Sequence, residues 1–264
     1  MKLKSSVLTG ALCSLIASNA GAALISWGTP TDMFSGDAND ASFISTNGVL
    51  VDAANGGSTL AGPTVVNGVP FNSIAGTNAG GQNLVSGNFS FLNHNDNASA
   101  FGQGEFGGGT AGVGDLIQSG IWGAQGVTLT GLTIGNDYEV QILGNDARGN
   151  RSDNFMAAYG DGSGSVTPAS GVVLLNNKPN AGGDGPAGSG GTTGQYIIGT
   201  FTADATEQTF LSYGTNSGNI GSLNNGDSRA HFNAIQLRNT TVPEPSSVLL
   251  TGLAALGFIG RRRR

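Results

Sequence analysis

The sequence predicts an all-β protein whose body is a single β-sandwich. The 46 glycines and 8 prolines make up about a fifth of the 264 residues, which disfavours helices but stays below the level typical of low-complexity disorder. Apolar and polar residues alternate with period two in several short runs separated by Gly and Asn. Between the two ends of the chain, no segment shows an apolar stripe with a 3.6-residue period. Strands are therefore expected to build the core.

The strand pattern begins near residue 43 and continues to residue 238. The expected strands are 43–51, 83–91, 127–132, 138–144, 155–159, 171–175, 196–203, 209–213 and 232–238. The pairs 127–132/138–144 and 196–203/209–213 are each separated by a short, turn-rich link, so each pair is expected to form a β-hairpin. Many short strands within one domain length favour a sandwich or a barrel.

The N-terminus has the features of a cleavable signal peptide at residues 1–22. Lys2 and Lys4 form a positive start, an apolar run follows at 7–17, and small residues precede a predicted cut between Ala22 and Ala23. A buried N-terminal helix is the alternative. The signal predicts export by the Sec machinery and processing by a signal peptidase.

Removal of this segment would also remove Cys13, the single cysteine of the chain. The mature body would then have no disulfide and no thiolate zinc site. His94 and His231 would remain as the imidazole groups. The body must therefore be held together by burial and hydrogen bonds.

The C-terminus combines a short motif, an apolar segment and an arginine cluster. These are Pro243, Glu244 and Pro245, then residues 246–260, then Arg261, Arg262, Arg263 and Arg264. The apolar segment is short for a membrane-spanning helix. Because four arginines resist translocation, they are expected to stay cytoplasmic and to act as a stop-transfer signal with the body outside. A short core helix ending in a solvated basic tail is the alternative.

Residues 242–264 resemble a PEP-CTERM sorting domain. The resemblance implies processing near the Pro-Glu-Pro motif by an exosortase, a membrane cysteine protease, in a Gram-negative bacterium that makes exopolysaccharide. The protein is then expected to be anchored transiently in the inner membrane and to end at the cell surface or outside the cell.

The body, residues 23–241, is strongly acidic. It contains 5 basic and 16 acidic residues, a net charge of −11. Such a body should repel nucleic acid and anionic lipid. Its charge suits neutral polymers or cations, so no nucleic-acid partner is expected.

The body also resembles jelly-roll domains of bacterial surface proteins, several of which bind carbohydrate. The resemblance is carried by residues 122–126, the Leu-Thr-Gly-Leu run at 129–132, the polar run at 145–151 and the closing strand at 232–237. It implies a jelly-roll-like sandwich. Any function that it implies rests on analogy.

The candidate ligand-binding residues are Trp122, Asp146, Arg148, Arg151 and Asp153. The tryptophan could stack on a sugar ring or fill the core at a strand entrance. The carboxylates, which directly follow a predicted strand, could hold calcium or could pair with the two arginines in a structural loop. No specific motif for calcium or another cofactor is present.

Catalysis has little support in the sequence. Neither histidine lies in a nucleophile-elbow or zinc-protease motif, and the acidic residues are scattered over the predicted loops. The sequence therefore predicts a non-catalytic surface or matrix protein that is associated with exopolysaccharide and is a candidate carbohydrate binder. A secreted polysaccharide hydrolase and an ice- or surface-binding protein are the alternatives.

Overall fold

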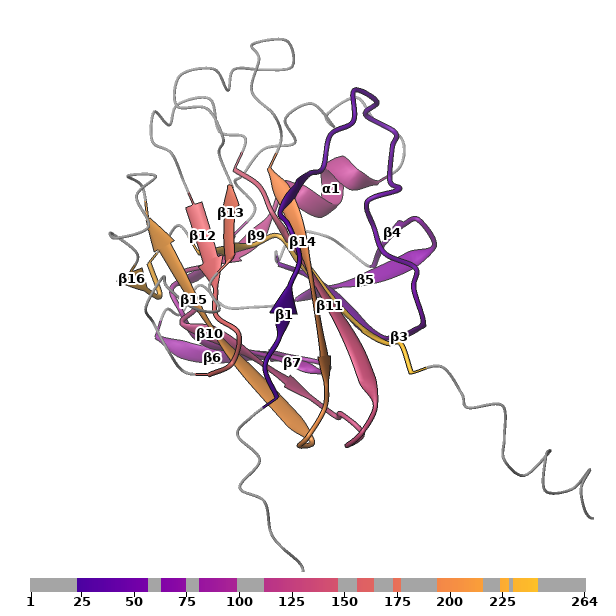
Figure 1. Ribbon diagram of the computed structural model, residues 1–264. Helices are drawn as coiled ribbons and strands as arrows, with labels where there is room; N and C mark the ends of the chain where they lie inside the picture. The colour runs from indigo at the N-terminus through magenta and orange to yellow at the C-terminus, as the bar shows by residue number, and fades with distance from the viewer. Residues whose placement is uncertain are drawn as a thin grey trace, which may run out of the picture.

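The computed structural model describes residues 23–56, 63–74, 81–98, 112–146, 156–163, 173–176, 194–215, 224–227 and 230–241. Over these residues the chain consists almost wholly of β-strands, with one short helix (Figure 1), which confirms the all-β prediction. In chain order the elements are β1 (Ser26–Trp27), β2 (Thr31–Asp32), β3 (Val49–Gly56), β4 (Thr64–Val66), β5 (Val69–Ile74), β6 (Gln82–Ser86), β7 (Phe89–His94), β8 (Asp96–Ala98), α1 (Val113–Ile117), β9 (Gly120–Trp122), β10 (Gly126–Thr130), β11 (Asp137–Gly144), β12 (Met156–Tyr159), β13 (Val173–Asn176), β14 (Gln195–Thr202), β15 (Glu207–Thr215), β16 (Asn224–Asn225), β17 (His231–Phe232) and β18 (Ala234–Asn239).

Most of these strands belong to two sheets that pack as a sandwich. The main sheet has the order β1-β14-β11-β18-β3-β5-β4, and β2 also pairs with β14. The second sheet has the order β13-β12-β15-β10-β7-β6, with β16 beside β15. Strands β17, β9 and β8 form a small third sheet. The described strands pair antiparallel except for β3 and β5, which are parallel.

The hydrophobic core lies between the two large sheets. Its members come from alternate positions of strands in both sheets, as period-two patterning requires. The core includes Val140, Ile142, Ile197, Ile235 and Leu237 of the main sheet and Phe89, Phe91, Val127, Leu129 and Phe210 of the second sheet, each at most 1% exposed. Without disulfides among the described residues, this apolar contact is the main source of stability.

The two predicted hairpins are wrong, although their strands exist. β10 pairs with β7 and β15 in the second sheet, whereas β11 pairs with β14 and β18 in the main sheet. In the same way β14 belongs to the main sheet and β15 to the second. Each short link therefore crosses from one sheet to the other, a connection that a jelly-roll-like sandwich uses.

The crossing links explain why no hairpin forms. Leu132 and Ala203 are only 4% and 3% exposed and belong to the core cluster, so each link carries an apolar residue into the gap between the sheets. The links also bond to each other: the Leu132 N–H donates to Thr206 O at 3.1 Å, and the Gly135 N–H donates to Ala203 O at 2.7 Å. Backbone groups that a hairpin turn would satisfy locally are satisfied across the two links.

Two other hairpins occur where single strands or no strands were expected. The predicted strand at 83–91 is the hairpin β6–β7, which turns at Gly87 with a positive φ of 53°. β4 and β5 pair across Asn67 and Gly68, with φ values of 48° and 74°. Asn-Gly with two positive φ angles is the preferred two-residue hairpin turn, because its twist matches that of the strands.

The outer face of the main sheet is also buried. A second apolar cluster covers part of it and is formed by Met33, Phe43, Ile44, Ala53, Val66, Val69, Phe71, Val113, Leu116, Ile117, Leu143 and Ala234. Residues 33–48, here called the strap, run over this face without forming a strand. The expected strand at 43–51 therefore begins only at Val49.

The third sheet lies directly against β3. A Cβ atom at Gly56 would come within 2.5 Å of the backbone nitrogen of Ile121 in β9, so only glycine permits this approach. The expected closing strand at 232–238 is interrupted at Asn233, which separates β17 in the third sheet from β18 in the main sheet. The Asn233 N–H donates to Leu143 O at 2.9 Å, so this break places the third sheet at the Gly144 end of β11.

Candidate functional site

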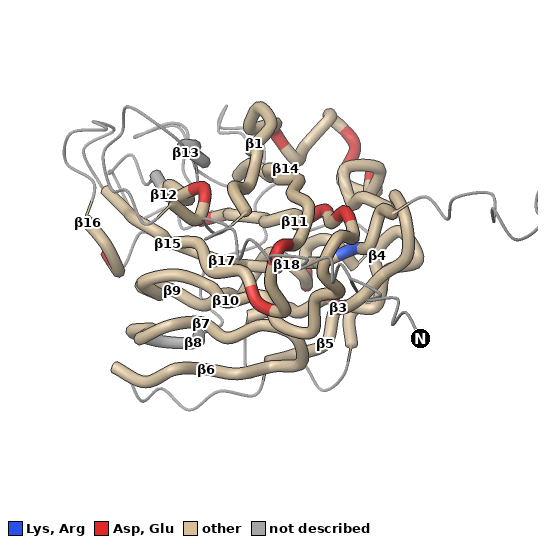
Figure 2. The backbone as a smooth tube through the Cα atoms, turned by 60° about the horizontal axis from the view of Figure 1, so that its bottom comes forward, with Lys and Arg blue, Asp and Glu red and all other residues tan. Residues whose placement is uncertain are grey.

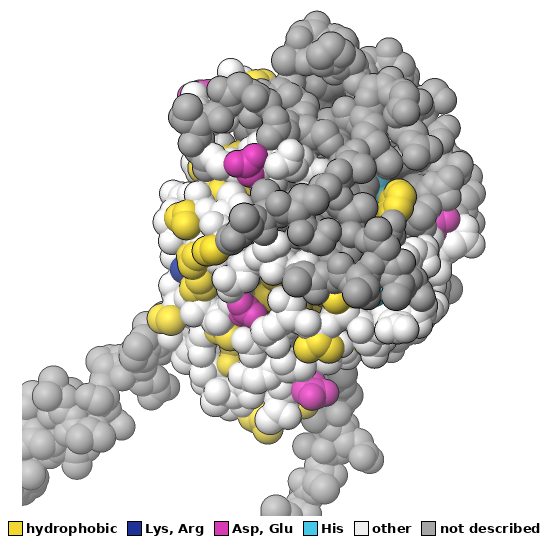
Figure 3. Space-filling view, turned by 180° about the vertical axis from the view of Figure 1, so that it is seen from behind, with side chains coloured by type: hydrophobic (Ala, Val, Ile, Leu, Met, Phe, Trp, Pro, Cys, Tyr) yellow, Lys and Arg dark blue, Asp and Glu magenta, His cyan; other side chains and the backbone are white. Residues whose placement is uncertain are grey.

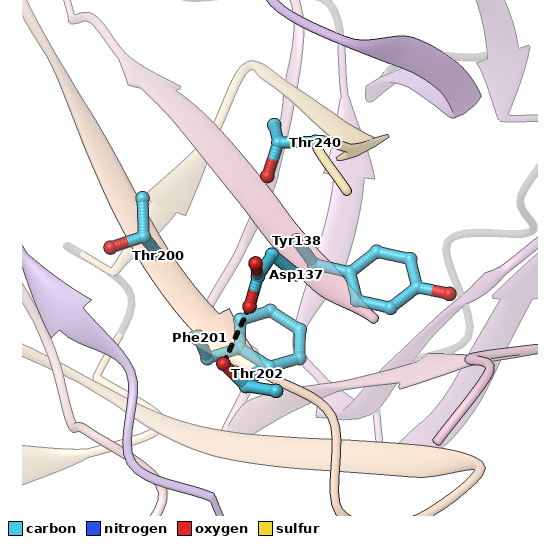
Figure 4. Close-up of a pocket in the computed structure, with 6 residues that line it drawn as sticks. All are labelled: Asp137, Tyr138, Thr200, Phe201, Thr202 and Thr240. Atoms are coloured by element: carbon cyan, nitrogen blue, oxygen red, sulfur yellow. Dashed lines mark hydrogen bonds between the residues drawn. The ribbon is translucent and has the colours of Figure 1, made fainter. Parts of the chain in front are cut away.

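The start of β11 lines a pocket of about 220 Å³, the first candidate site. Its lining residues are Asp137, Tyr138, Thr200, Phe201, Thr202 and Thr240. They come from β11, from the end of β14 and from the residue that follows β18. Figure 4 shows Asp137 and Thr202 facing each other, with Thr200 and Thr240 on either side.

Hydrogen bonds hold this pocket in shape. The Thr202 hydroxyl donates to Asp137 Oδ1 at 2.6 Å, and the Tyr138 and Phe201 rings stack with centroids 5.6 Å apart. Both aromatic rings are almost completely buried, so the accessible polar groups of the lining include the threonine hydroxyls and the Asp137 carboxylate. Such a surface can exchange hydrogen bonds with water, sugar hydroxyls or a peptide backbone.

A second carboxylate lies nearby but does not line the pocket. Glu139 shares the outer face of β11 with Asp137, is only 6% exposed, and accepts a hydrogen bond from Asn47 Nδ2 at 3.1 Å. Its other oxygen, Oε1, is buried and has no hydrogen-bond partner. A hydrolase needs two carboxylates that face one cleft, whereas this pocket presents Asp137 as its one carboxylate among the described residues.

The outer face of β11 and β18 carries a buried row of polar side chains. Glu139 lies opposite Arg238, and Gln141 lies opposite Gln236. All four are at most 6% exposed. Burial lowers the pKa of Arg238, and the negative charge of Glu139 opposes that shift.

This polar row holds the strap. Gln141 Nε2 donates to Phe43 O at 2.6 Å, and Gln236 Nε2 donates to Ser45 O at 3.1 Å. The Arg238 guanidinium donates to the backbone oxygens of residues 47 and 48 at 2.5 and 3.1 Å. Side chains therefore supply the hydrogen bonds that a neighbouring strand would have made.

The far end of β11 contains a buried cluster of amide side chains. Asn233 Nδ2 donates to the backbone oxygens of Ile117 and Ser119 at 2.7 and 2.9 Å, and Asn233 Oδ1 accepts from the Asn145 N–H at 2.6 Å. Asn55 Nδ2 donates to Leu116 O and to Asn233 O. These bonds satisfy the last carbonyls of α1, so the cluster has a structural role.

Of the five predicted ligand residues, two are described. Asp146 follows β11 and is buried at 1% exposure, and Trp122 ends β9 and is partly exposed. Arg148, Arg151 and Asp153 lie outside the described residues. The structure therefore leaves the proposed calcium or salt-bridged loop untested.

Trp122 stands on a rigid support. It is in register with His231 of β17 on one side and with Asp96 of β8 on the other, and its ring centroid lies 6.3 Å from that of His231. Behind this sheet, the Tyr159 hydroxyl donates to His231 O at 2.7 Å, and burial raises the pKa of Tyr159 far above its usual range. The neutral phenol thus fixes the strand that supports the tryptophan.

The two histidines are buried in strands. His231 is fully buried, and His94 is 2% exposed with Nδ1 at 2.7 Å from Gln82 O. His94 is the last residue of β7. His94 Nε2 is buried without a hydrogen-bond partner.

Most side chains on the described surface are uncharged, and the charged side chains that are exposed are acidic. Arg238 is the one Lys or Arg among the described residues (Figure 2), and it is buried. Exposed acidic residues are spread over several elements: Asp32, Asp37, Asp115, Asp137 and Glu207. Where Figure 3 shows described residues, their surface is mainly uncharged with scattered acidic side chains.

In the parts of the chain that the structure describes, no three His, Cys, Asp or Glu side chains gather as a metal site would require. Over the same residues, no helix is long and apolar enough to cross a membrane. The predicted signal peptide, the Pro-Glu-Pro motif, the apolar segment 246–260 and the terminal arginines all lie outside the described residues.

Comparison with known families identifies the C-terminus. The PEP-CTERM protein-sorting motif matches residues 241–264, as expected from Pro243, Glu244, Pro245 and the arginine cluster. The chain is thus an exported protein targeted to an exosortase, secreted after a transient stay in the membrane. Because the match covers only the tail, it carries no information about the body.

The body itself has no informative relative. Comparison with curated proteins finds no match. Among solved structures, the chain is similar to the crystal structure of Bacteroides uniformis β-glucuronidase, with a TM-score of 0.39 and 15% identity over 71% of this chain. It spans only 18% of the length of that protein, and a similarity of this size supports no functional argument.

Proposed function

We propose that the mature body is a non-catalytic surface or matrix domain that associates with the extracellular polysaccharide of the producing cell through Trp122. The observation that carries the proposal is the partly exposed indole on a strand fixed on both sides. The sorting motif supports it by directing the body to the outside of the cell.

The geometry of Trp122 suits a sugar ring. Its Nε1 atom has no solvent-accessible surface, so whatever part of the ring faces solvent is carbon. The carbon face of a pyranose stacks on such a surface and loses little side-chain entropy, because the indole is already held in place.

Charge restricts the class of polysaccharide. The body has a net charge of −11, and the one described cation is buried beneath the strap. Uronate-rich or sulfated polymers would be repelled at low salt. A neutral polysaccharide is therefore the favoured ligand.

The experiment is retention of the purified body on the polysaccharide of the producer, with the Trp122→Ala variant. We expect retention to weaken about tenfold or more while the thermal midpoint falls by only a few degrees, because an exposed aromatic contributes mainly to binding. Trp122→Phe should retain part of the binding. Trp27→Phe serves as the control, because Trp27 packs against Tyr159 and Phe210 in the core.

Two outcomes would overturn the proposal. If Trp122→Ala melts the domain while Trp122→Phe binds as well as the native protein, Trp122 is a core residue. If the body shortens the polysaccharide and one Asp or Glu substitution abolishes that, the hydrolase interpretation replaces binding.

A further inference from the structure

The last residues of the body are bonded to the start of β11. The Thr240 N–H donates to Asp137 O at 2.8 Å, and the Asp137 N–H donates to the Thr241 hydroxyl at 2.8 Å. The Thr241 N–H donates to Asn239 Oδ1 at 2.9 Å. These three hydrogen bonds are here called the tail clasp. The two bonds to Asp137 fasten the chain to the main sheet where β18 ends, and the third holds Thr241 against Asn239.

The clasp lies beside the sorting motif. The matched motif begins at residue 241, and Val242 is the one residue between the clasp and Pro243. A fully extended chain spans at most about 3.6 Å per residue, so Pro243 lies within about 11 Å of Thr240. Any enzyme that binds the Pro-Glu-Pro motif must therefore come close to this end of the sandwich.

A protease binds its substrate as an extended strand with residues on both sides of the cut. With the clasp closed, the residues on the N-terminal side are already hydrogen-bonded to the body.

We propose that the tail clasp controls processing of the sorting tail: the clasp opens before the processing protease can bind the chain on the N-terminal side of the motif. Thr241 and Asn239 are positioning residues in this scheme, because they act by holding the backbone. The pocket lined by Asp137, Thr200, Thr202 and Thr240 is the surface of the body that the bound protease then faces.

The scheme has a kinetic consequence. When opening and closing are fast compared with cleavage, the cleavage rate follows the population of the open form. The clasp bonds lie at the end of β18, and the ends of elements are where local opening is easiest. Weakening the clasp should therefore speed processing and leave the fold intact.

The test uses the full-length protein in a cell that processes it, carrying the double substitution Asn239→Ala and Thr241→Val. These changes remove the two clasp bonds that depend on side chains and keep the main-chain bond of Thr240. Conversion of precursor to processed protein, followed by pulse-chase, should be about tenfold faster, as the loss of one or two hydrogen bonds predicts. In the purified body, the amide of residue 240 should exchange with solvent faster.

Thr209→Val is the matched control. Its hydroxyl makes an exposed 2.8 Å hydrogen bond to Thr128 in the second sheet, away from the tail, so the precursor should be processed at the native rate. A clasp variant processed at or below the rate of Thr209→Val would overturn the proposal. Unchanged amide exchange at residue 240 would also overturn it, because the clasp would then not be holding the chain.

Discussion

The two faces of strands β11 and β18 are both buried, yet they are built from opposite chemistry. On the inner face, Val140, Ile142, Ile235 and Leu237 meet the second sheet and are fully buried. On the outer face, the residues between them are Glu139, Gln141, Gln236 and Arg238, and these are at most 6% exposed. Alternation in the sequence therefore does not distinguish core from solvent here.

What covers each face explains the difference. The inner face packs against another sheet whose backbone is already hydrogen-bonded, so apolar side chains suffice. The outer face is covered by the strap, an irregular segment whose backbone N–H and C=O groups would otherwise be buried without partners. Long amide and guanidinium side chains supply those partners, for example Gln141, which donates to Phe43 O and accepts from the Ser45 N–H.

The largest effect is expected on the inner face. Ile142→Ala removes a fully buried side chain that lies between Ile197 and Ile235 in register, and the cavity should cost roughly 2–5 kcal/mol of unfolding free energy. Ile134, which is 61% exposed, provides the control: Ile134→Ala should change stability by less than about 0.5 kcal/mol. Denaturant titration measures both.

A small cost for Ile142→Ala would contradict the two-sheet core. It would mean that neighbouring side chains fill the cavity or that water reaches the inner face of the main sheet.

On the outer face, Arg238→Met should cost about 1–3 kcal/mol. The substitution keeps the aliphatic stem but removes the charged donor of two partly buried hydrogen bonds to the backbone oxygens of Asn47 and Gly48. The same substitution should speed amide exchange in the strap more than in β11.

Arg238→Lys decides whether charge or geometry matters. A lysine keeps the positive charge near Glu139, but it lacks the planar fork that reaches several acceptors at once. We expect it to recover less than half of the lost stability. Full recovery of stability would contradict this expectation. It would show that Arg238 stabilises the outer face through its electrostatic interaction with Glu139 and not through its hydrogen bonds to the strap.

The sequence predicted the strands better than their partners. Period-two alternation located β10, β11, β14, β15 and β18, because burial of one face leaves that mark. It could not show that the links containing Leu132 and Ala203 cross from one sheet to the other, so both predicted hairpins are wrong. The Asn67-Gly68 turn did carry a recognisable hairpin signal. The five-residue helix α1 is too short to leave a periodic pattern.

The candidate sites divide in the same way. The sorting motif was predictable because its residues are contiguous. The pocket at Asp137 was not, since Thr200, Thr202 and Thr240 come together only through strand register. The burial of Gln141 and Gln236 was likewise invisible, because amide side chains on a strand ordinarily indicate a solvated face.

The strap also has solvent-exposed hydrogen bonds between its own residues, and the loss of these bonds should give the smallest effect. Asp40 accepts hydrogen bonds from the Ser35 hydroxyl at 2.6 Å and from the Ser42 N–H at 2.8 Å. The bond from Ser35 is the largest cause, and together with the bonds from the side chain and the backbone of Ser42 it lowers the pKa of Asp40 to about 2 from 3.8. A carboxyl whose pKa is depressed by folding stabilises the folded state above its unfolded pKa.

This contribution should therefore be complete above about pH 4 and should disappear as the pH falls through about 2. Because the carboxylate is solvent-exposed, this contribution should be small. Ser35→Ala should move the pKa of Asp40, measured by NMR titration, back toward 3.8, whereas Thr46→Ala elsewhere in the strap should not. If acid speeds amide exchange in the strap as strongly as Arg238→Met does, the buried polar row is not what mainly holds the strap. The contrast between the two faces would then need another cause.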